Sequence, residues 1–328
     1  MRKNNNPEEI LDLIKSKEKI ITCMDARFDY DSFCSVLAMS KFLESLGKNY
    51  EVTYFTKLPE QAKEVFDTSL VKENVEPNKI DFSKYDLLIF LDSGDSKHLN
   101  KLFNFKVPSG ITTLCIDHHT KEELYADYNY VDDAEVSNCS LLLDLLESWK
   151  FKIEKDVATF LFTGLLFDSG FFQFKKTNAE SFKKAARLIE LGADKDNIIQ
   201  KTTFNEEHRS MIIKKILYKN LVVDFSNRFA YSILSIDGLR RNKISTTEHN
   251  SISPADEIKK LSGVDFVFVI TEVKRKSVFN VSLRSHNLNF DVAKIANGLG
   301  GAGHQMAAGA NVKAKSFGEV VKMVLDCV

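Results

Sequence analysis

Short apolar runs that end in acidic residues recur in the first half of the chain. They extend from Ile20 to Met24, from Leu87 to Leu91 and from Thr112 to Ile116. Runs of this length with β-branched residues, separated by helical patterns, are typical of buried parallel strands in an α/β sheet. Ligands in open sheets of this kind bind beyond the carboxyl ends of the strands. We therefore expect the acids that follow the runs, Asp25, Asp92 and Asp117, to gather along one edge.

Apolar residues at helical spacing mark the segments between and after these runs. The spacing predicts helices at Ser32 to Leu46, Val157 to Phe167 and Ala179 to Leu191. The first and third of these end at glycines, Gly47 and Gly192, which are common just beyond helix ends. The pattern predicts an α/β fold with a parallel-sheet domain at the N-terminus.

The second half of the chain has a different pattern. A polar, charged region from about Lys195 to Arg209 precedes a helix-like run to Asn220. Strand-like runs follow at Phe229 to Ile236, Val264 to Val273 and Val278 to Arg284, with a helical segment near Asp291 to Asn297. Because 328 residues exceed one typical core, we predict domains at 1–194 and 221–328, joined by a linker with a helix at 195–220. The second is a smaller α/β domain.

Composition and charge narrow the classes of partner. With 44% hydrophobic and 28% charged residues the chain is of ordinary globular type. A formal charge of -1 argues against a broad surface for long duplex nucleic acid, which needs many Lys and Arg. The charged N-terminus lacks a signal-peptide core, and no apolar run has membrane-spanning length, so we expect a soluble cytoplasmic protein with no membrane partner. The five widely spaced cysteines predict reduced, mostly buried thiols.

Three carboxylates follow the first predicted strand. Asp25, Asp29 and Asp31 stand just before a predicted helix. Asp31 taken alone is equally well explained as a helix N-cap. Three such acids at a strand end repel one another unless cations neutralise them, and oxygen-rich clusters favour Mg²⁺ or Mn²⁺. We therefore interpret the group as metal ligands.

Further candidate ligands follow the other runs. Asp92 lies in Leu-Asp-Ser-Gly-Asp, which is also a turn sequence. Asp117, His118 and His119 are consecutive. Because imidazoles bind transition ions and a neighbouring carboxylate can orient the ring, we favour a ligand over a buried structural histidine. Asp168 follows the apolar helix in Gly-Leu-Leu-Phe-Asp-Ser-Gly.

A glycine-rich segment, Gly-Gly-Ala-Gly-His, occupies residues 300–304. Glycines allow the backbone to approach a phosphate and to present N–H groups to it, and His304 and Arg284 add donors or positive charge. A tight turn is the alternative explanation. We favour phosphate binding because Arg284 and the downstream Ala-Ala-Gly at 307–309 accompany the segment.

The ordered set of motifs resembles the DHH phosphoesterase superfamily. The D-x-D segment, the isolated Asp92, Asp117-His118-His119 and Asp168 in its Asp-Ser-Gly context carry the resemblance. The Ser-Leu-Arg-Ser run at 282–285 and the glycine-rich segment resemble the associated C-terminal substrate-binding domain. The chain is most similar to the group that degrades very short RNA (nanoRNA) and removes the 3′-phosphate from adenosine 3′,5′-bisphosphate (pAp). The resemblance thus implies a manganese-dependent hydrolase of exonuclease or oligoribonuclease and pAp phosphatase type, which binds short RNA oligonucleotides or small nucleotides.

The resemblance also implies residue roles. It implies metal ligands at Asp25, Asp29, Asp31, Asp92, His118 and Asp168, catalytic residues at His119 and Asp117, and substrate-binding residues at Arg284, Ser285, Gly300, Gly301, Gly303 and His304. Two Mn²⁺ ions are implied, with Mg²⁺ as the alternative, and Asp92 would bridge them. His119 would lie near the scissile phosphate, and Asp117 would orient a histidine.

The chain departs from the family pattern at two positions, and the resemblance leaves other functions open. The family commonly has histidine at the position of Asp25 and a glycine at the position of Ala302. The alternatives are a linear or cyclic dinucleotide phosphodiesterase, a family-II inorganic pyrophosphatase and a nucleotide sensor without catalysis. The sequence leaves open whether the chain is a monomer or forms a homodimer.

Overall fold

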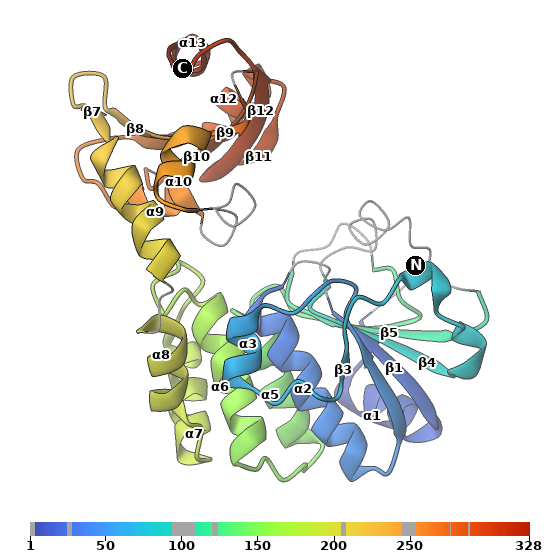
Figure 1. Cartoon of the computed structure of the whole chain (residues 1–328). Coiled ribbons are helices and arrows are strands. Elements are labelled where there is room, and N and C mark those ends of the chain that lie inside the picture. Colours follow the sequence, from blue (N-terminus) through green and yellow to red (C-terminus); the bar gives the residue numbers. More distant parts are fainter. Residues whose placement is uncertain are drawn as a thin grey trace. The chain divides into compact units, whose positions relative to one another are not determined.

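The computed structural model describes residues 4–24, 28–93, 109–119, 124–204, 208–244, 253–275, 277–287 and 289–328. The chain divides into two compact units, Met1–Asn205 (unit 1) and Glu206–Val328 (unit 2). Figure 1 shows the elements of both units. The segment predicted to link the domains contains one helix of each unit, α8 (Lys195–Thr203) and α9 (His208–Lys219).

A parallel sheet forms the centre of unit 1. Its described strands are β1 (Lys19–Cys23), β2 (Asn49–Thr53), β3 (Val71–Lys72), β4 (Leu87–Leu91), β5 (Thr112–Asp117) and β6 (Tyr128–Val131). They lie in the order β3-β2-β1-β4-β5-β6, and every pair is parallel. The order reverses between β1 and β4, where doubly wound sheets leave a crevice beyond the strand ends. The predicted α/β parallel sheet is confirmed.

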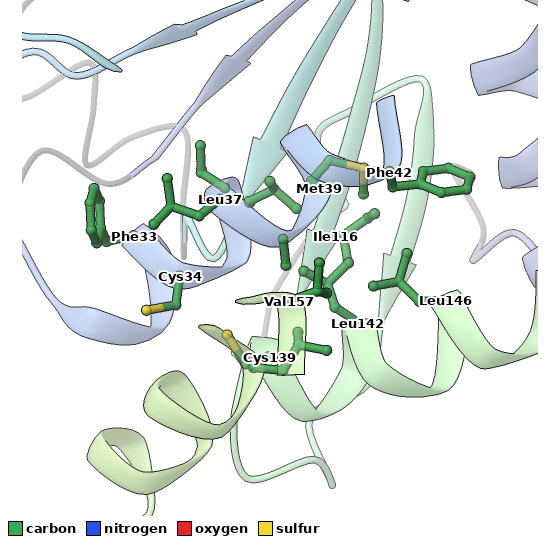
Figure 2. Close-up of a cluster of buried hydrophobic side chains, with 14 of the residues drawn as sticks. Phe33, Cys34, Leu37, Met39, Phe42, Ile116, Cys139, Leu142, Leu146 and Val157 are labelled. Atoms are coloured by element: carbon green, nitrogen blue, oxygen red, sulfur yellow. The ribbon is translucent and has the colours of Figure 1, made fainter. Parts of the chain in front are cut away.

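Helices pack against the sheet of unit 1 and against one another. They are α1 (Pro7–Ser16), α2 (Tyr30–Ser45), α3 (Glu60–Val65), α5 (Asn138–Ser148), α6 (Lys155–Asp168), α7 (Ala179–Glu190) and α8, with 3-10 turns at Pro77–Lys79 and Phe82–Lys84. Helix α2 is buried almost all round, because α5, α6 and the sheet all contact it. Figure 2 shows side chains of this core, among them Leu37 of α2, Ile116 of β5 and Leu142 of α5.

Alternation along the strands divides the apolar residues of unit 1 between two cores. In β4, Leu87, Ile89 and Leu91 join the core beneath the helices. Leu88 and Phe90 join a smaller core on the other face, packed against Phe82 and other residues from loops. Because β1, β4 and β5 are buried on both faces, they read as continuous apolar runs, and these are the three strands of the sheet that the sequence predicts.

Unit 2 is built on a mixed sheet. Its described strands are β7 (Val222–Asp224), β8 (Phe229–Leu234), β9 (Phe266–Lys274), β10 (Val278–Ser285), β11 (Ala302–His304) and β12 (Ala307–Lys313), in the order β11-β12-β10-β9-β8-β7. Strands β8 and β9 are parallel and the other pairs antiparallel. Helices α12 (Val292–Gly298) and α13 (Phe317–Leu325) pack on one face, and α9, α10 (Ile236–Arg241) and α11 (Pro254–Ile258) on the other.

Two further expectations concern thiols and membranes. All five cysteines are free, and four of them are buried, as predicted. Within the described residues, no helix combines the length and the apolar character needed to cross a bilayer.

Candidate functional site

The carboxyl ends of β4 and β5 bring three predicted site residues together. Asp92 follows β4 directly with φ of 51°, a left-handed conformation that is uncommon outside glycine. Its N–H donates to the carbonyl of Ile116 at 3.0 Å, which fixes this turn to the neighbouring strand. Asp117 ends β5 and His118 follows it, and all three side chains are buried. Strained, buried polar residues at strand ends are characteristic of functional sites.

Helices α2 and α6 add two carboxylates. Asp29, not Asp31, is the N-cap of α2 and accepts from the N–H of Ser32 at 2.7 Å. Asp31 therefore lies in the first turn, fully buried, where its oxygens accept from the N–H groups of Asn138 at 2.6 Å and Cys139 at 2.9 Å. Asp168 is the last residue of α6. The cap explanation considered for Asp31 is thus wrong, because the cap position belongs to Asp29.

The ring of His118 lies at the centre of these acids. Its Nε2 is 3.2 Å from Asp168 Oδ2, 3.4 Å from Asp92 Oδ1 and 3.8 Å from Asp31 Oδ2. Its Nδ1 lies 3.3 Å from the carbonyl oxygen of Glu135. A carbonyl oxygen only accepts, so Nδ1 carries the proton and Nε2 keeps its lone pair. Among the described residues, neither this Nε2 nor Asp92 Oδ1 has a hydrogen-bond partner.

Electrostatics point to a cation at this place. Burial and then the charge of Asp168 raise the pKa of Asp31, and burial and then Asp31 raise the pKa of Asp92. Burial lowers the pKa of His118 to about 4, which disfavours a proton on Nε2. A lone pair facing carboxylates is repulsive unless a proton or metal ion lies between them. Carboxylates with a neutral imidazole form a donor set that suits Mn²⁺. The fit to a divalent ion is therefore good.

The ligand atoms form two groups. Asp31, His118 and Asp168 form one, and Asp92, His118 and His119 the other; within each, the possible ligand atoms lie within 4.8 Å of one another. Both groups share His118. The predicted ligand Asp29 interacts electrostatically with the site. Its charge is the third largest cause, after burial and the charge of Asp31, that raises the pKa of Asp92. The predicted ligand Asp25 lies outside the described residues.

Asp117 orients His119. One oxygen of Asp117 accepts from His119 Nδ1 at 2.8 Å and from the His119 backbone N–H at 3.0 Å. This bond, acting against burial, raises the pKa of His119. The His119 side chain is half exposed, whereas Asp117 is fully buried. A proton at Nδ1 leaves the other ring nitrogen of His119 for a ligand or substrate.

A left-handed turn follows Asp168. Gly170, Phe171 and Phe172 have φ values of 59°, 57° and 62°, so two bulky residues adopt a costly conformation. The turn is closed by the N–H of Gln173, which donates to the carbonyl of Ser169 at 3.1 Å. Beyond it, Lys176 Nζ donates to the carbonyl of His118 at 3.3 Å. The turn thus brings a cation beside the cluster of acids. Lys176 could not be predicted as a site residue, because an exposed Lys-Lys pair has no pattern that distinguishes it from other surface lysines.

The predicted substrate-binding residues lie in unit 2, and Arg284 already has a partner there. Its Nε and Nη2 donate to the two oxygens of Asp256 at 3.0 and 3.1 Å, and Nη2 also donates to Ser253 Oγ at 3.0 Å. Ser285 is buried, and its hydroxyl donates to the carbonyl of Asp265 at 2.7 Å. The neighbouring Ser285 is therefore held within the fold.

The glycine-rich segment at 300–304 follows α12 and its C-cap Leu299, and it includes the edge strand β11. A Cβ added at Gly301 would lie 2.1 Å from the carbonyl oxygen of Gly309, and one added at Gly303 would lie 2.4 Å from Ala308 Cα. Close packing of β11 on β12 thus requires these two glycines. Gly300 has φ of 74°, and His304 is exposed at the sheet edge.

Comparisons with known proteins agree with these motifs. Residues 19–165 match the DHH family, N-terminal domain, and residues 231–328 match the DHHA1 domain. The bifunctional oligoribonuclease and PAP phosphatase NrnA of Thermus thermophilus is 25% identical over 322 residues, which cover 98% of this chain and 91% of that protein. An uncharacterized protein of Methanocaldococcus jannaschii is 24% identical over 306 residues. This chain spans 60% of its length.

Solved structures share the fold. An exopolyphosphatase-related protein from Bacteroides fragilis superimposes with a TM-score of 0.86 at 20% identity, covering 98% of this chain and 94% of that one. RecJ of Thermus thermophilus, solved in complex with Mn²⁺, gives a TM-score of 0.51 at 14% identity, covering 97% of this chain and 53% of that one.

Proposed function

Because the chain belongs to the DHH family of phosphoesterases and carries a DHHA1 domain, we propose that it hydrolyses short oligoribonucleotides, adenosine 3′,5′-bisphosphate or both, with two Mn²⁺ ions. The oligoribonuclease and PAP phosphatase of Thermus thermophilus, similar over nearly the whole chain, supports this substrate class. The RecJ structure with Mn²⁺ supports the choice of ion.

One observation carries the proposal. The buried Nε2 of His118 has no hydrogen-bond partner among the described residues and faces carboxylate oxygens of Asp31, Asp92 and Asp168 within 3.8 Å. Burying such a lone pair among acids costs free energy that a cation would recover. In this proposal Asp31, Asp168 and His118 hold one ion, Asp92 lies between the two sites, and Asp29 and Asp25 complete the set. Divalent ions bound there would activate a water molecule and neutralise charge on the phosphate.

The protein's own groups have separate tasks around the phosphate. The 2.8 Å bond from His119 Nδ1 to Asp117 fixes the orientation of the His119 ring. We assign the other ring nitrogen, Nε2, to contact with the scissile phosphate. Lys176, held near the cluster by the His118 carbonyl, adds a positive charge for a phosphate oxygen. Asp117 itself is fully buried and acts through His119.

Unit 2 supplies substrate binding in this proposal. Arg284 and His304, with the backbone of Gly300, Gly301 and Gly303, would bind a terminal phosphate or base of the nucleotide. A net charge of -1 agrees with short rather than long nucleic acid. The proposed location of the protein is the cytoplasm.

A substrate panel tests the proposal. Metal-depleted protein is supplied with Mn²⁺ or Mg²⁺ and assayed on a diribonucleotide, a long single-stranded RNA, adenosine 3′,5′-bisphosphate, a cyclic dinucleotide and pyrophosphate. We expect Mn²⁺-dependent turnover of the diribonucleotide or the bisphosphate, and much slower turnover of long RNA. Turnover of pyrophosphate alone would replace the proposal with a pyrophosphatase. Ion binding with no turnover of any substrate would indicate a nucleotide sensor.

A further inference from the structure

A buried lysine of α7 packs against α5 and the segment that leads into it. Lys184 lies on the inner face of α7 and is only 7% exposed. Its Nζ donates to Asp144 Oδ2 at 2.6 Å, to Glu135 Oε1 at 2.7 Å and to the carbonyl of Ser140 at 3.2 Å. All three N–H bonds of the ammonium are therefore used. Burial alone would lower the pKa of Lys184, but the bonds with Asp144 and Glu135 outweigh it, so the group stays charged.

One partner of Lys184 contacts His118. The carbonyl of Glu135 accepts from His118 Nδ1 at 3.3 Å, and this contact selects the tautomer that turns Nε2 toward the acids. The Glu135 side chain is held from two sides, by Lys184 at 2.7 Å and by the hydroxyl of Ser140 at 2.6 Å. The position of this carbonyl thus depends on a residue whose own side chain is clamped.

The same short segment also holds Asp31. Three to four residues beyond Glu135, the N–H groups of Asn138 and Cys139 at the start of α5 donate to the two oxygens of the Asp31 carboxylate, at 2.6 and 2.9 Å. Residues 135–140 therefore contact both His118, which follows β5, and Asp31 of α2. Lys184 joins both ends of this segment, through Glu135 and the Ser140 carbonyl, to α7.

We propose that Lys184 is a positioning residue for the candidate metal centre: by clamping residues 135–140 it aligns His118 and Asp31 for a divalent ion that Lys184 itself does not contact. This inference rests on the proposed function. Without the ammonium, the Glu135 and Asp144 carboxylates would face each other without a cation, and repulsion would displace the segment. The Glu135 carbonyl and the two N–H groups of α5 would then move together.

The test compares Lys184→Met with Lys183→Met. Lys183 is the adjacent residue of α7, is 73% exposed and pairs only with Glu180 among the described contacts, at 3.1 Å, so it controls for the loss of one lysine. Mn²⁺ affinity of metal-depleted protein is measured by calorimetry well below the thermal midpoint of each variant. We expect Lys184→Met to weaken Mn²⁺ binding roughly 10- to 100-fold. Lys183→Met should bind as wild type does, and Lys184→Arg should restore most of the affinity.

A second pair of variants separates positioning from stability. Glu135→Gln removes the charge on the residue that contacts His118, whereas Asp144→Asn changes a partner of Lys184 that, among the described contacts, does not touch a candidate ligand. Both should lower the midpoint, but only Glu135→Gln should also weaken Mn²⁺ binding strongly. In metal-free protein, the ¹⁵N signals of the His118 ring should shift in Lys184→Met and Glu135→Gln and not in Lys183→Met.

The outcomes are distinct. If Lys184→Met folds and binds Mn²⁺ with wild-type affinity, the positioning role is overturned and the proposed function is left intact. If Lys184→Met does not fold, wild-type affinity in Glu135→Gln has the same consequence. Equal loss of affinity in Asp144→Asn and Glu135→Gln would also overturn it, since that result indicates general loosening. Wild-type protein that binds no Mn²⁺ would overturn the proposed function together with this inference.

Discussion

The backbone of Gly164 in α6 touches the carboxylate of Asp31 so closely that a Cβ on this glycine would lie 2.5 Å from Asp31 Oδ1 and 2.3 Å from Cys139 Sγ. The glycine allows α6 to approach α2 where both contribute a candidate ligand. The close approach of the two helices places both Asp31 and Asp168 within 3.8 Å of His118 Nε2.

Gly164→Ala should therefore damage both the fold and the site. The new methyl group must displace Asp31 or Cys139, and overpacking of this kind costs about 1–3 kcal/mol. We expect a lower thermal midpoint and at least tenfold weaker Mn²⁺ binding, measured by calorimetry. Gly318→Ala in α13, where the nearest atom is 4.0 Å away, is the control: it should leave Mn²⁺ binding unchanged and should not lower the midpoint, because alanine is the better helix former.

Asp92→Asn should remove metal and turnover together. Asp92 is almost fully buried, and its Oδ1 has no hydrogen-bond partner among the described residues, so its charge is the property that a cation would use. We expect a loss of turnover of at least ~10³-fold and fewer than two ions per chain by elemental analysis. Two tightly bound ions with near-normal turnover would remove Asp92 from the metal centre.

The two histidines should separate binding from catalysis. His118 faces three carboxylates, whereas His119 is half exposed and bonded to Asp117. His118→Ala should weaken ion binding, and His119→Ala should lower kcat about 10²–10⁴-fold while most ion affinity remains. Calorimetry and steady-state kinetics on the same samples check this. A similar loss of ions in both variants would make His119 a ligand.

Arg284→Ala should affect substrate use without affecting metal content. Its guanidinium forms two bonds with Asp256, and a phosphate would have to compete with that carboxylate or share the arginine with it. We expect KM for the diribonucleotide to rise about tenfold or more, with His304→Ala showing a smaller rise. Elemental analysis should show unchanged ions. Unchanged kinetics on every substrate would exclude both residues from substrate binding.

Asp256 should make the stability of unit 2 depend on pH in the acidic range. Burial acts to raise its pKa, but hydrogen bonds from Arg284, Lys259 and Ser253 outweigh burial and lower it from 3.8 to about 2. Because the folded pKa is the lower one, this stabilisation is present above about pH 4 and is lost between about pH 4 and about pH 2. Thermal unfolding across that range should show Asp256→Asn less stable than wild type near neutrality, with the difference shrinking on acidification. Asp237→Asn, which breaks the exposed 2.9 Å pair with Arg275, should show little difference at any pH.

The sequence predicts those parts of the site that lie next to buried strands. Asp92 and Asp117 follow continuous apolar runs, and a strand buried on both faces cannot be mistaken for an amphipathic one. The strands β1, β4 and β5 and the clustering of acids at their carboxyl ends follow from the same signal. The fold of unit 2 is less visible, because short edge strands such as β7 and β11 have only three residues each.

The supporting contacts could not be predicted in this way. Glu135 acts on His118 through a backbone carbonyl, and Asn138 acts on Asp31 through a backbone N–H, groups that every residue carries. Lys184 looks like any lysine of a surface helix until its neighbours are known. Asp31 shows the same difficulty: whether an acid before a helix is a cap or a ligand depends on one residue of register, and the cap is Asp29.

The candidate ligands come from strands and helices that are far apart along the chain, from Asp29 to Asp168. No single described helix of unit 1 contains all the candidate ligands, so the ion should bind only chains in which the parallel sheet has formed. Strand pairings between distant parts of the chain form slowly. If the ion binds only after the folding transition state, it slows unfolding without accelerating folding. The cation would then mainly lower the unfolding rate. Refolding rates would hardly change with the Mn²⁺ concentration, whereas resistance to proteolysis would rise with it.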